Sequence, residues 1–194
     1  MAFYVTPVSR IKLSLGYIIS AWLVGTGMCV LTLAAGEVYF LISGYGFLGA
    51  AAFFRLAGLI AVCTFTFSAL GYLLALFVHS DSAWSGLLTV IGTLVGFLGG
   101  IYLSLGSLSE GLQNLLKCLP VLPCTAMLRE ACTGEAIRET FAGLPETAGD
   151  VFRREMGITL FWGEKEITTL EQVAFLLTYA IIAIAAAALV NRKR

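Results

Sequence analysis

Charged side chains are scarce in this sequence. Only 12% of its 194 residues are Asp, Glu, Lys or Arg, whereas 59% are hydrophobic and the mean hydropathy is +0.92. This is too little charge to cover the surface of a soluble domain. The sequence therefore indicates an integral membrane protein whose main partner is the lipid bilayer. Its net charge of zero gives no reason to expect a nucleic-acid partner.

Side chains that carry out chemistry are also few. His79 is the single histidine, so the cysteines have no histidine at metal-ligand spacing and no Ser/His/Asp set can be assembled. No G-x-x-x-x-G-K-[ST] phosphate loop occurs. The glycines at 44, 46 and 49 match a dinucleotide pattern but lack a preceding strand, which favours a simple turn. We expect no metal, no cofactor and no enzymatic activity in this chain.

Four apolar runs are long enough to cross roughly 30 Å of hydrocarbon, which takes about 20 helical residues. Backbone inside a membrane must satisfy its own hydrogen bonds, so these runs are predicted to be helices. The fold class is therefore all-α, a polytopic helix bundle forming a single transmembrane domain. The predicted spans are residues 15–36, 53–78, 83–105 and 170–190.

Basic residues at both ends of the chain predict its orientation. Arg10 and Lys12 precede the first run, and residues 191–194 form a basic tail. Because Lys and Arg gather on the cytoplasmic side of a membrane, we expect both termini and the turn at His79 to be cytoplasmic. Residues 110–171 carry 6 basic and 10 acidic side chains, a balance of −4 that suits the outer face of a cell (plasma or inner) membrane.

Asp, Glu, Lys and His are missing from the middle of all four runs. Arg55 and Glu171 lie at predicted outer ends, where a long side chain reaches the interface at little cost. Proton-driven carriers and ion pumps normally need such groups within the membrane. If the protein transports a substrate, we therefore expect the energy to come from elsewhere.

Three glycines in the third run are spaced four residues apart. Gly92, Gly96 and Gly100 would share one helix face, where another helix could approach closely. Ordinary helix packing is the simpler interpretation, and the lining of a substrate path is the alternative.

Two prolines interrupt an apolar stretch at residues 107–134. Neither half around Pro120 and Pro123 reaches spanning length, so we expect two short helices that meet at the prolines. A re-entrant hairpin on the outer face is one interpretation, and an interfacial surface helix is the other. The polar stretch at residues 135–169 is expected to be an outer segment with short helical pieces.

The spacing of the five cysteines does not by itself indicate a disulfide framework. Cys29 and Cys63 are expected within spans. Cys118, Cys124 and Cys132 share the outer segment, where two of them could form a disulfide in an oxidising compartment, although their odd number leaves one thiol over.

The chain resembles the permease subunits of type-2 ABC exporters of the drug, polysaccharide and lipid-efflux kind. The resemblance is carried by TPVSRIKLSLGYIIS at residues 6–20, similar to their cytoplasmic coupling helix, and by LPVLPCTAMLREACTG at residues 119–134, similar to their outer re-entrant helices. It implies a coupling helix at residues 6–16, with Pro7, Ser9, Arg10 and Lys12 facing a cytoplasmic ATP-binding subunit. It also implies an outer gate that includes Pro120, Pro123 and Arg129.

The same resemblance implies a second permease subunit, identical or related, and ATP-driven export by alternating access. Such permeases usually have six spans, so this chain is expected to correspond to their last four. The alternative from another class is a non-transporting accessory or truncated membrane protein that only packs against partner subunits. The residues that an intramembrane enzyme would need are absent from this sequence.

The topology can be tested by labelling. In variants that keep one cysteine each, an impermeant thiol reagent added to intact cells should label Cys118, Cys124 or Cys132 where accessible, because the basic flanks put these residues at the outer face. A cysteine introduced at Ser80 should stay unlabelled until the membrane is opened. Labelling of the Ser80 variant from outside would show that the predicted orientation is wrong.

Overall fold

The computed structural model describes residues 10–44, 49–100, 102, 104–143, 145–163 and 165–193. The elements in chain order are α1 (Arg10–Ile42), α2 (Ala50–Ala75), α3 (Asp81–Leu98), the 3-10 helix η2 (Leu105–Ser107), α4 (Glu110–Lys117), α5 (Val121–Thr140), α6 (Glu146–Glu155), β1 (Phe161–Trp162), β2 (Lys165–Glu166) and α7 (Thr169–Lys193). Apart from the two-residue antiparallel strands, the described elements are helices. The predicted all-α bundle is confirmed.

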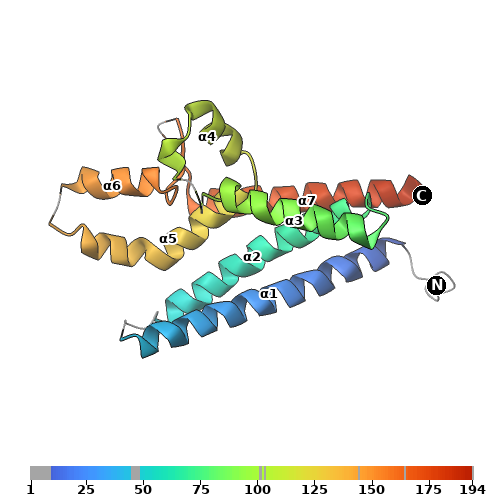
Figure 1. Ribbon diagram of the computed structural model, residues 1–194, viewed down its shortest axis with the longest axis horizontal. Coiled ribbons are helices and arrows are strands. Elements are labelled where there is room, and N and C mark those ends of the chain that lie inside the picture. The colour runs from blue at the N-terminus through green and yellow to red at the C-terminus, as the bar shows by residue number, and fades with distance from the viewer. Residues whose placement is uncertain are drawn as a thin grey trace.

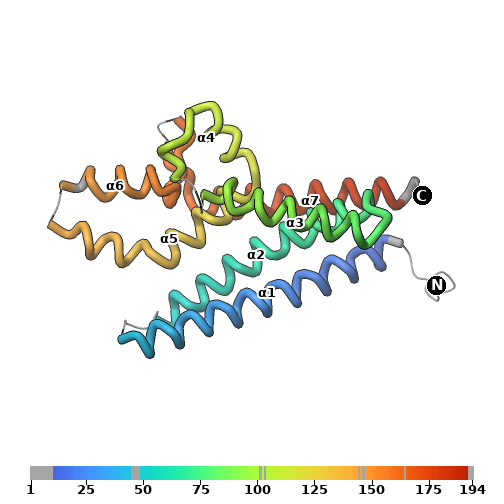
Figure 2. Tube along the Cα trace, in the orientation of Figure 1, coloured from blue at the N-terminus to red at the C-terminus, as the bar shows by residue number. Residues whose placement is uncertain are grey.

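Four of these helices, α1, α2, α3 and α7, are long and apolar enough to cross a membrane, as predicted. Figure 1 shows α1, α2 and α7 along one another, with the start of α1 and the end of α7 at the same end. We call this the terminal end of the bundle. At the opposite end, which we call the hairpin end, α5 and α6 extend beyond the start of α2, as the tube in Figure 2 shows.

The first span is longer than hydropathy predicts. Helix α1 has 33 residues and is about 50 Å long, more than the hydrocarbon thickness of roughly 30 Å. Arg10 begins this helix, so the described part of the predicted coupling segment continues into the span without a break. The predicted end of the first span at residue 36 is also wrong, because Glu37 lies within α1 with its side chain buried. Of the predicted turn at residues 44–49, only Gly44 and Gly49 are among the described residues.

The third span is shorter than predicted because two glycines end it. Helix α3 stops at Leu98, and Gly100 follows with φ +68°, a conformation that glycine adopts without steric cost. The Gly100 N–H donates to Phe97 O at 3.1 Å, as in a glycine helix end. The predicted run to residue 105 is therefore wrong.

The predicted glycine face of α3 is wrong for Gly100, which lies outside the helix. Gly96 is covered by the Tyr102 ring, which would lie only 2.3 Å from an added Cβ, and Gly92 faces open space. No described neighbouring helix packs against the Gly92 position, so its helix packing stays a prediction.

The centre of the bundle is the contact between α2 and α7. The buried residues of α2 recur every three or four positions, as expected for one helix face. Opposite them α7 presents small side chains, Ala180, Ala183 and Ala187, each at most 1% exposed. Thr66 Oγ1 donates to Val62 O of its own helix at 3.1 Å and to Leu176 O of α7 at 3.2 Å. Small residues thus let the two backbones approach closely.

This close approach can be tested at Ala180. We expect Ala180→Leu to separate α2 from α7 and to destabilise the protein by about 1–3 kcal/mol, because the side chain has no room. Ala185→Leu is the matched control, since Ala185 is exposed on the same helix. Thermal unfolding of the purified protein in detergent measures both. Equal midpoints for the two variants would contradict the packing.

Candidate functional site: a helical hairpin between two spans

Helices α4 and α5 form a hairpin that breaks at residues 118–120. Pro120 is the N-cap residue of α5, with φ −65°, and Pro123 lies in its first turn. A proline in the first turn costs no hydrogen bond, because the N–H groups there have no partner within the helix. The prediction of two helices meeting at the prolines is confirmed, although α5 continues to Thr140 instead of ending near residue 134.

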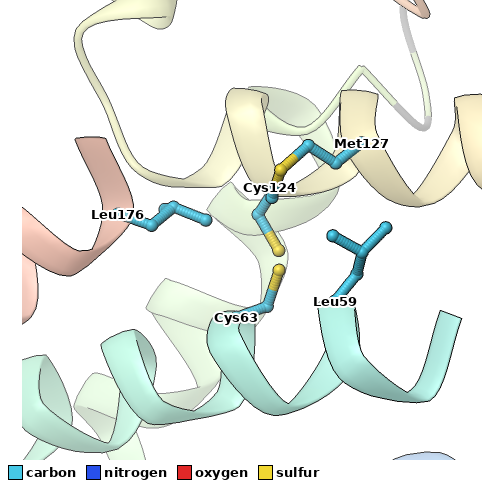
Figure 3. Packing of buried hydrophobic residues seen from close by; sticks show 5 residues of the cluster. All are labelled: Leu59, Cys63, Cys124, Met127 and Leu176. Carbon is cyan, nitrogen blue, oxygen red and sulfur yellow. The ribbon is translucent and has the colours of Figure 1, made fainter. Parts of the chain in front are cut away.

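The first turns of α5 lie between α2 and α7. Cys124 and Met127 pack with Leu59 and Cys63 of α2 and Leu176 of α7 in one buried cluster. Figure 3 shows the Cys63 and Cys124 sulfur atoms pointing toward each other. Leu176 lies roughly 10 Å along α7 from its start and Cys63 roughly 20 Å along α2. The start of α5 therefore packs against the middle of α2 and the first turns of α7.

The broken backbone at the apex of the hairpin is held by a side chain of α7. Tyr179 Oη donates to the carbonyl oxygen of Cys118 at 2.5 Å. The N–H groups of Cys118 and Leu119 donate to Leu115 O and Leu116 O at 3.1 and 3.0 Å. Backbone groups between apolar helices must find such partners, because an unpaired group there costs several kcal/mol.

Arg129 joins α5 to two loops. Its Nη1 donates to Met156 O at 2.9 Å, after α6, and its Nη2 donates to Gly100 O at 2.7 Å, after α3. Desolvation by burial lowers the pKa of Arg129 from its usual value, but the guanidinium remains charged at neutral pH. A planar guanidinium can reach two carbonyl groups in fixed directions at once.

A second arginine joins α6 to the same face of α5. Arg153 Nη1 lies 2.7 Å from Glu130 Oε2, and its Nη2 donates to Gly134 O at 3.0 Å. Both side chains are mostly buried, at 16% and 25% exposed. The two contacts fix α6 beside the part of α5 that extends past the bundle.

A comparison with protein-family models decides what kind of membrane protein this is. The model described as ABC-2 family transporter protein matches residues 1–189, nearly the whole chain. The chain belongs to the ABC-2 transporter family. It is a multi-pass membrane permease, a transport subunit and not an enzyme. No curated protein and no solved structure matches it.

Two of the residues expected to contact an ATPase, Arg10 and Lys12, lie at the terminal end of this ABC-2 protein. Pro7 and Ser9 are outside the described residues. Arg10 is the first residue of α1, and Lys12, two residues later, is exposed. The structure therefore brings Pro120, Pro123 and Arg129 together on one helix and leaves Arg10 and Lys12 at the terminal end.

Directly after Lys12, three side chains of three helices meet in a polar contact. Tyr72 Oη of α2 donates to Ser14 Oγ of α1 at 2.8 Å. Asn191 Nδ2 of α7 lies 2.9 Å from Ser14 Oγ and 3.2 Å from Tyr72 Oη. Sequence reasoning missed this contact, because its members are far apart in the chain and each is an ordinary residue for a helix.

The cysteines are all free thiols. Cys118 and Cys132 are exposed, and Cys124 is buried against Cys63 of α2 instead of near either of them. A hydrogen bond with the Cys63 thiol, together with burial, raises the pKa of the Cys124 thiol above its usual value. Both side chains are buried and pack as small apolar groups.

The role of Arg129 can be tested by comparing it with Arg138, an exposed residue on the same helix. We expect Arg129→Gln to destabilise the protein by about 2 kcal/mol, because two hydrogen bonds from a charged group are lost. Arg129→Lys should recover only part of this, since an ammonium cannot span both carbonyls. Arg138→Gln should change stability by less than about 0.5 kcal/mol.

Thermal unfolding measures these changes, and hydrogen exchange locates them. Exchange should rise after α3 and after α6 in Arg129→Gln. Protection that is unchanged in both loops would contradict the bridging role.

Proposed function

We propose that this chain is the membrane-spanning permease subunit of an ATP-driven ABC export system in the cell (plasma or inner) membrane. The observation that carries the proposal is the ABC-2 family match over residues 1–189, in a chain with four helices able to cross a membrane. A separate cytoplasmic ATP-binding subunit supplies the energy, and a second permease subunit, identical or related, completes the transporter.

Alternating access in this proposal is a movement of the hairpin relative to α2 and α7. The contact at Cys63 and Cys124 is made of apolar packing, and Tyr179 holds the break through a single hydrogen bond. Such contacts can separate and re-form without breaking an ion pair. Pro120 and Pro123 keep α4 and α5 as two helices, so the hairpin can move at residues 118–120 as a hinge.

Coupling to the ATPase is proposed at the start of α1. Arg10 and Lys12 put positive charge there, on the side that we propose is cytoplasmic. The polar contact of Ser14, Tyr72 and Asn191 ties these first turns of α1 to α2 and α7. A force on α1 would therefore reach α2, which contacts α1, α5 and α7.

The alternative is an accessory membrane protein that only packs against partner subunits. Helix α3 leaves most of its surface uncovered, because Gly96 is its only buried residue. This exposure favours packing against a further membrane partner. Both functions predict binding to other membrane chains. They differ in whether an ATPase binds at the terminal end.

Arg10 provides the test. The chain should co-purify with a phosphate-loop ATPase of the same organism expressed with it, and Arg10→Glu should weaken this binding, because a charge at a contact steers association and selects the partner. Arg55→Glu, the same change on α2 near the hairpin end, is the matched control and should bind normally.

Membrane insertion should be the same for the wild-type chain and both variants. Binding that Arg10→Glu leaves unchanged would exclude Arg10 from the contact. An absence of ATPase binding by every form would favour the accessory function.

A further inference from the structure

Two clefts adjoin beside α4 and share one lining side chain, Lys117 at the end of α4. The first has a volume of about 370 Å³ and is lined mainly by polar residues of α4 and of the segment from Arg154 to Gly163. The second has a volume of about 400 Å³ and lies between the start of α5, the β1–β2 strands and the first turns of α7. We call them the polar cleft and the apolar cleft. Each is as large as a small-molecule site.

Two positively charged side chains, Lys117 and Arg154, line the polar cleft together with one carboxylate, that of Glu110. Burial and then the charge of Arg154 lower the pKa of Lys117, and Glu110 acts in the opposite direction. Lys117 and Arg154 line the same cleft, so their two positive charges repel each other. The ion pairs found among the described residues, Arg153–Glu130 and Lys165–Glu171, include neither cation. A bound anion would offset this repulsion.

Neighbouring groups hold both cations in the cleft. The Arg154 guanidinium lies 4.3 Å from the centroid of the Phe161 ring. Lys117 Nζ donates to Asn114 Oδ1 at 3.2 Å. Phe161 and Asn114 line the same cleft, so the two charges are presented toward a common space.

The apolar cleft continues from Lys117 along hydrophobic side chains, which include Pro123, Leu160 and Phe175. Trp162 stands at its rim and is 58% exposed. Exposed tryptophan together with lysine is typical of the membrane–water interface, where α7 begins. An acyl chain in this cleft would therefore run from the interface toward the hydrocarbon.

Gln172 brings one polar side chain to the lining of the apolar cleft. Its side chain is 5% exposed, and its Nε2 donates to Ile167 O at 3.0 Å. Its Oε1 is the one buried side-chain oxygen without a hydrogen-bond donor among the described residues. An acyl chain has no donor to offer this oxygen, so the cations of the polar cleft, and not Gln172, select the ligand.

We propose that the two clefts together bind one anionic phospholipid of the surrounding membrane, with its phosphate between Lys117 and Arg154 and an acyl chain in the apolar cleft. A soluble phosphate would use the two cations but leave the apolar cleft empty. A zwitterionic lipid would fill the apolar cleft but bring a second cation toward Lys117 and Arg154. The site does not require an ATPase, so it can be tested apart from the proposed function.

Trp162 provides the probe. The protein with Trp22→Phe and Trp84→Phe keeps Trp162 as its single tryptophan and is placed in nanodiscs of phosphatidylcholine. In one set of nanodiscs a small part of the lipid is replaced by phosphatidylglycerol with brominated acyl chains, and in the other set by phosphatidylcholine with brominated acyl chains. Bromine quenches tryptophan fluorescence on contact. We expect brominated phosphatidylglycerol to quench Trp162 at a mole fraction on the order of 10-fold lower, because two cations favour the anionic headgroup.

Charge variants show whether the preference belongs to this site. Lys117→Gln with Arg154→Gln should abolish the difference between the two lipids, and each single change should reduce it. Arg154→Lys keeps the charge and should retain it. Arg55→Gln is the control for general surface charge and should also retain it, because Arg55 does not line either cleft. Circular dichroism confirms that each variant is folded.

Three results would overturn the proposal. The first is equal quenching of Trp162 fluorescence by the two brominated lipids in the single-tryptophan protein that keeps Lys117 and Arg154. The second is a preference that survives Lys117→Gln with Arg154→Gln, or that Arg55→Gln removes equally. The third is loss of the preference when millimolar inorganic phosphate is added, since this would assign the two cations to a soluble anion.

Discussion

The break in the backbone between α4 and α5 is the constraint on which the rest of the molecule depends. A chain that turns between apolar helices leaves N–H and C=O groups that neither lipid nor apolar side chains can satisfy. Here Tyr179 supplies a donor to Cys118, and Pro120 and Pro123 remove N–H groups where a helix start would leave them unpaired. These contacts allow the start of α5 to pack against both α2 and α7. Its position in turn places Arg129 within reach of the loops after α3 and α6.

Helix α2 connects the two ends of the molecule. Toward the terminal end its Tyr72 meets Ser14 of α1 and Asn191 of α7, and toward the hairpin end its Cys63 packs against Cys124 of α5. Between them, small residues of α7 keep the two long helices close along their length. A displacement at the start of α1 can therefore change the fit of the hairpin without a change inside any helix.

The sequence was sufficient to predict the four spans and the break at the prolines. Long apolar runs and proline act through neighbouring residues, so composition and spacing reveal them. Hydropathy predicts the wrong end for α3 because it does not register that Gly100 can leave the helical conformation. The Cys63–Cys124 contact, the partners of Arg129 and the role of Tyr179 depend on side chains that are far apart in the chain. No local pattern marks them, and only the packed structure brings them together.

The most direct test is whether the hairpin moves when ATP binds. In a variant that keeps Cys63 and Cys124 and lacks the other three cysteines, the two thiols can be cross-linked with an oxidant in the complex with the ATPase. Transport by hairpin movement predicts that the yield of the cross-link changes severalfold between the nucleotide-free and ATP-bound complexes, and that the cross-linked protein no longer exports. An equal yield in both states, or export by the cross-linked protein, would contradict it.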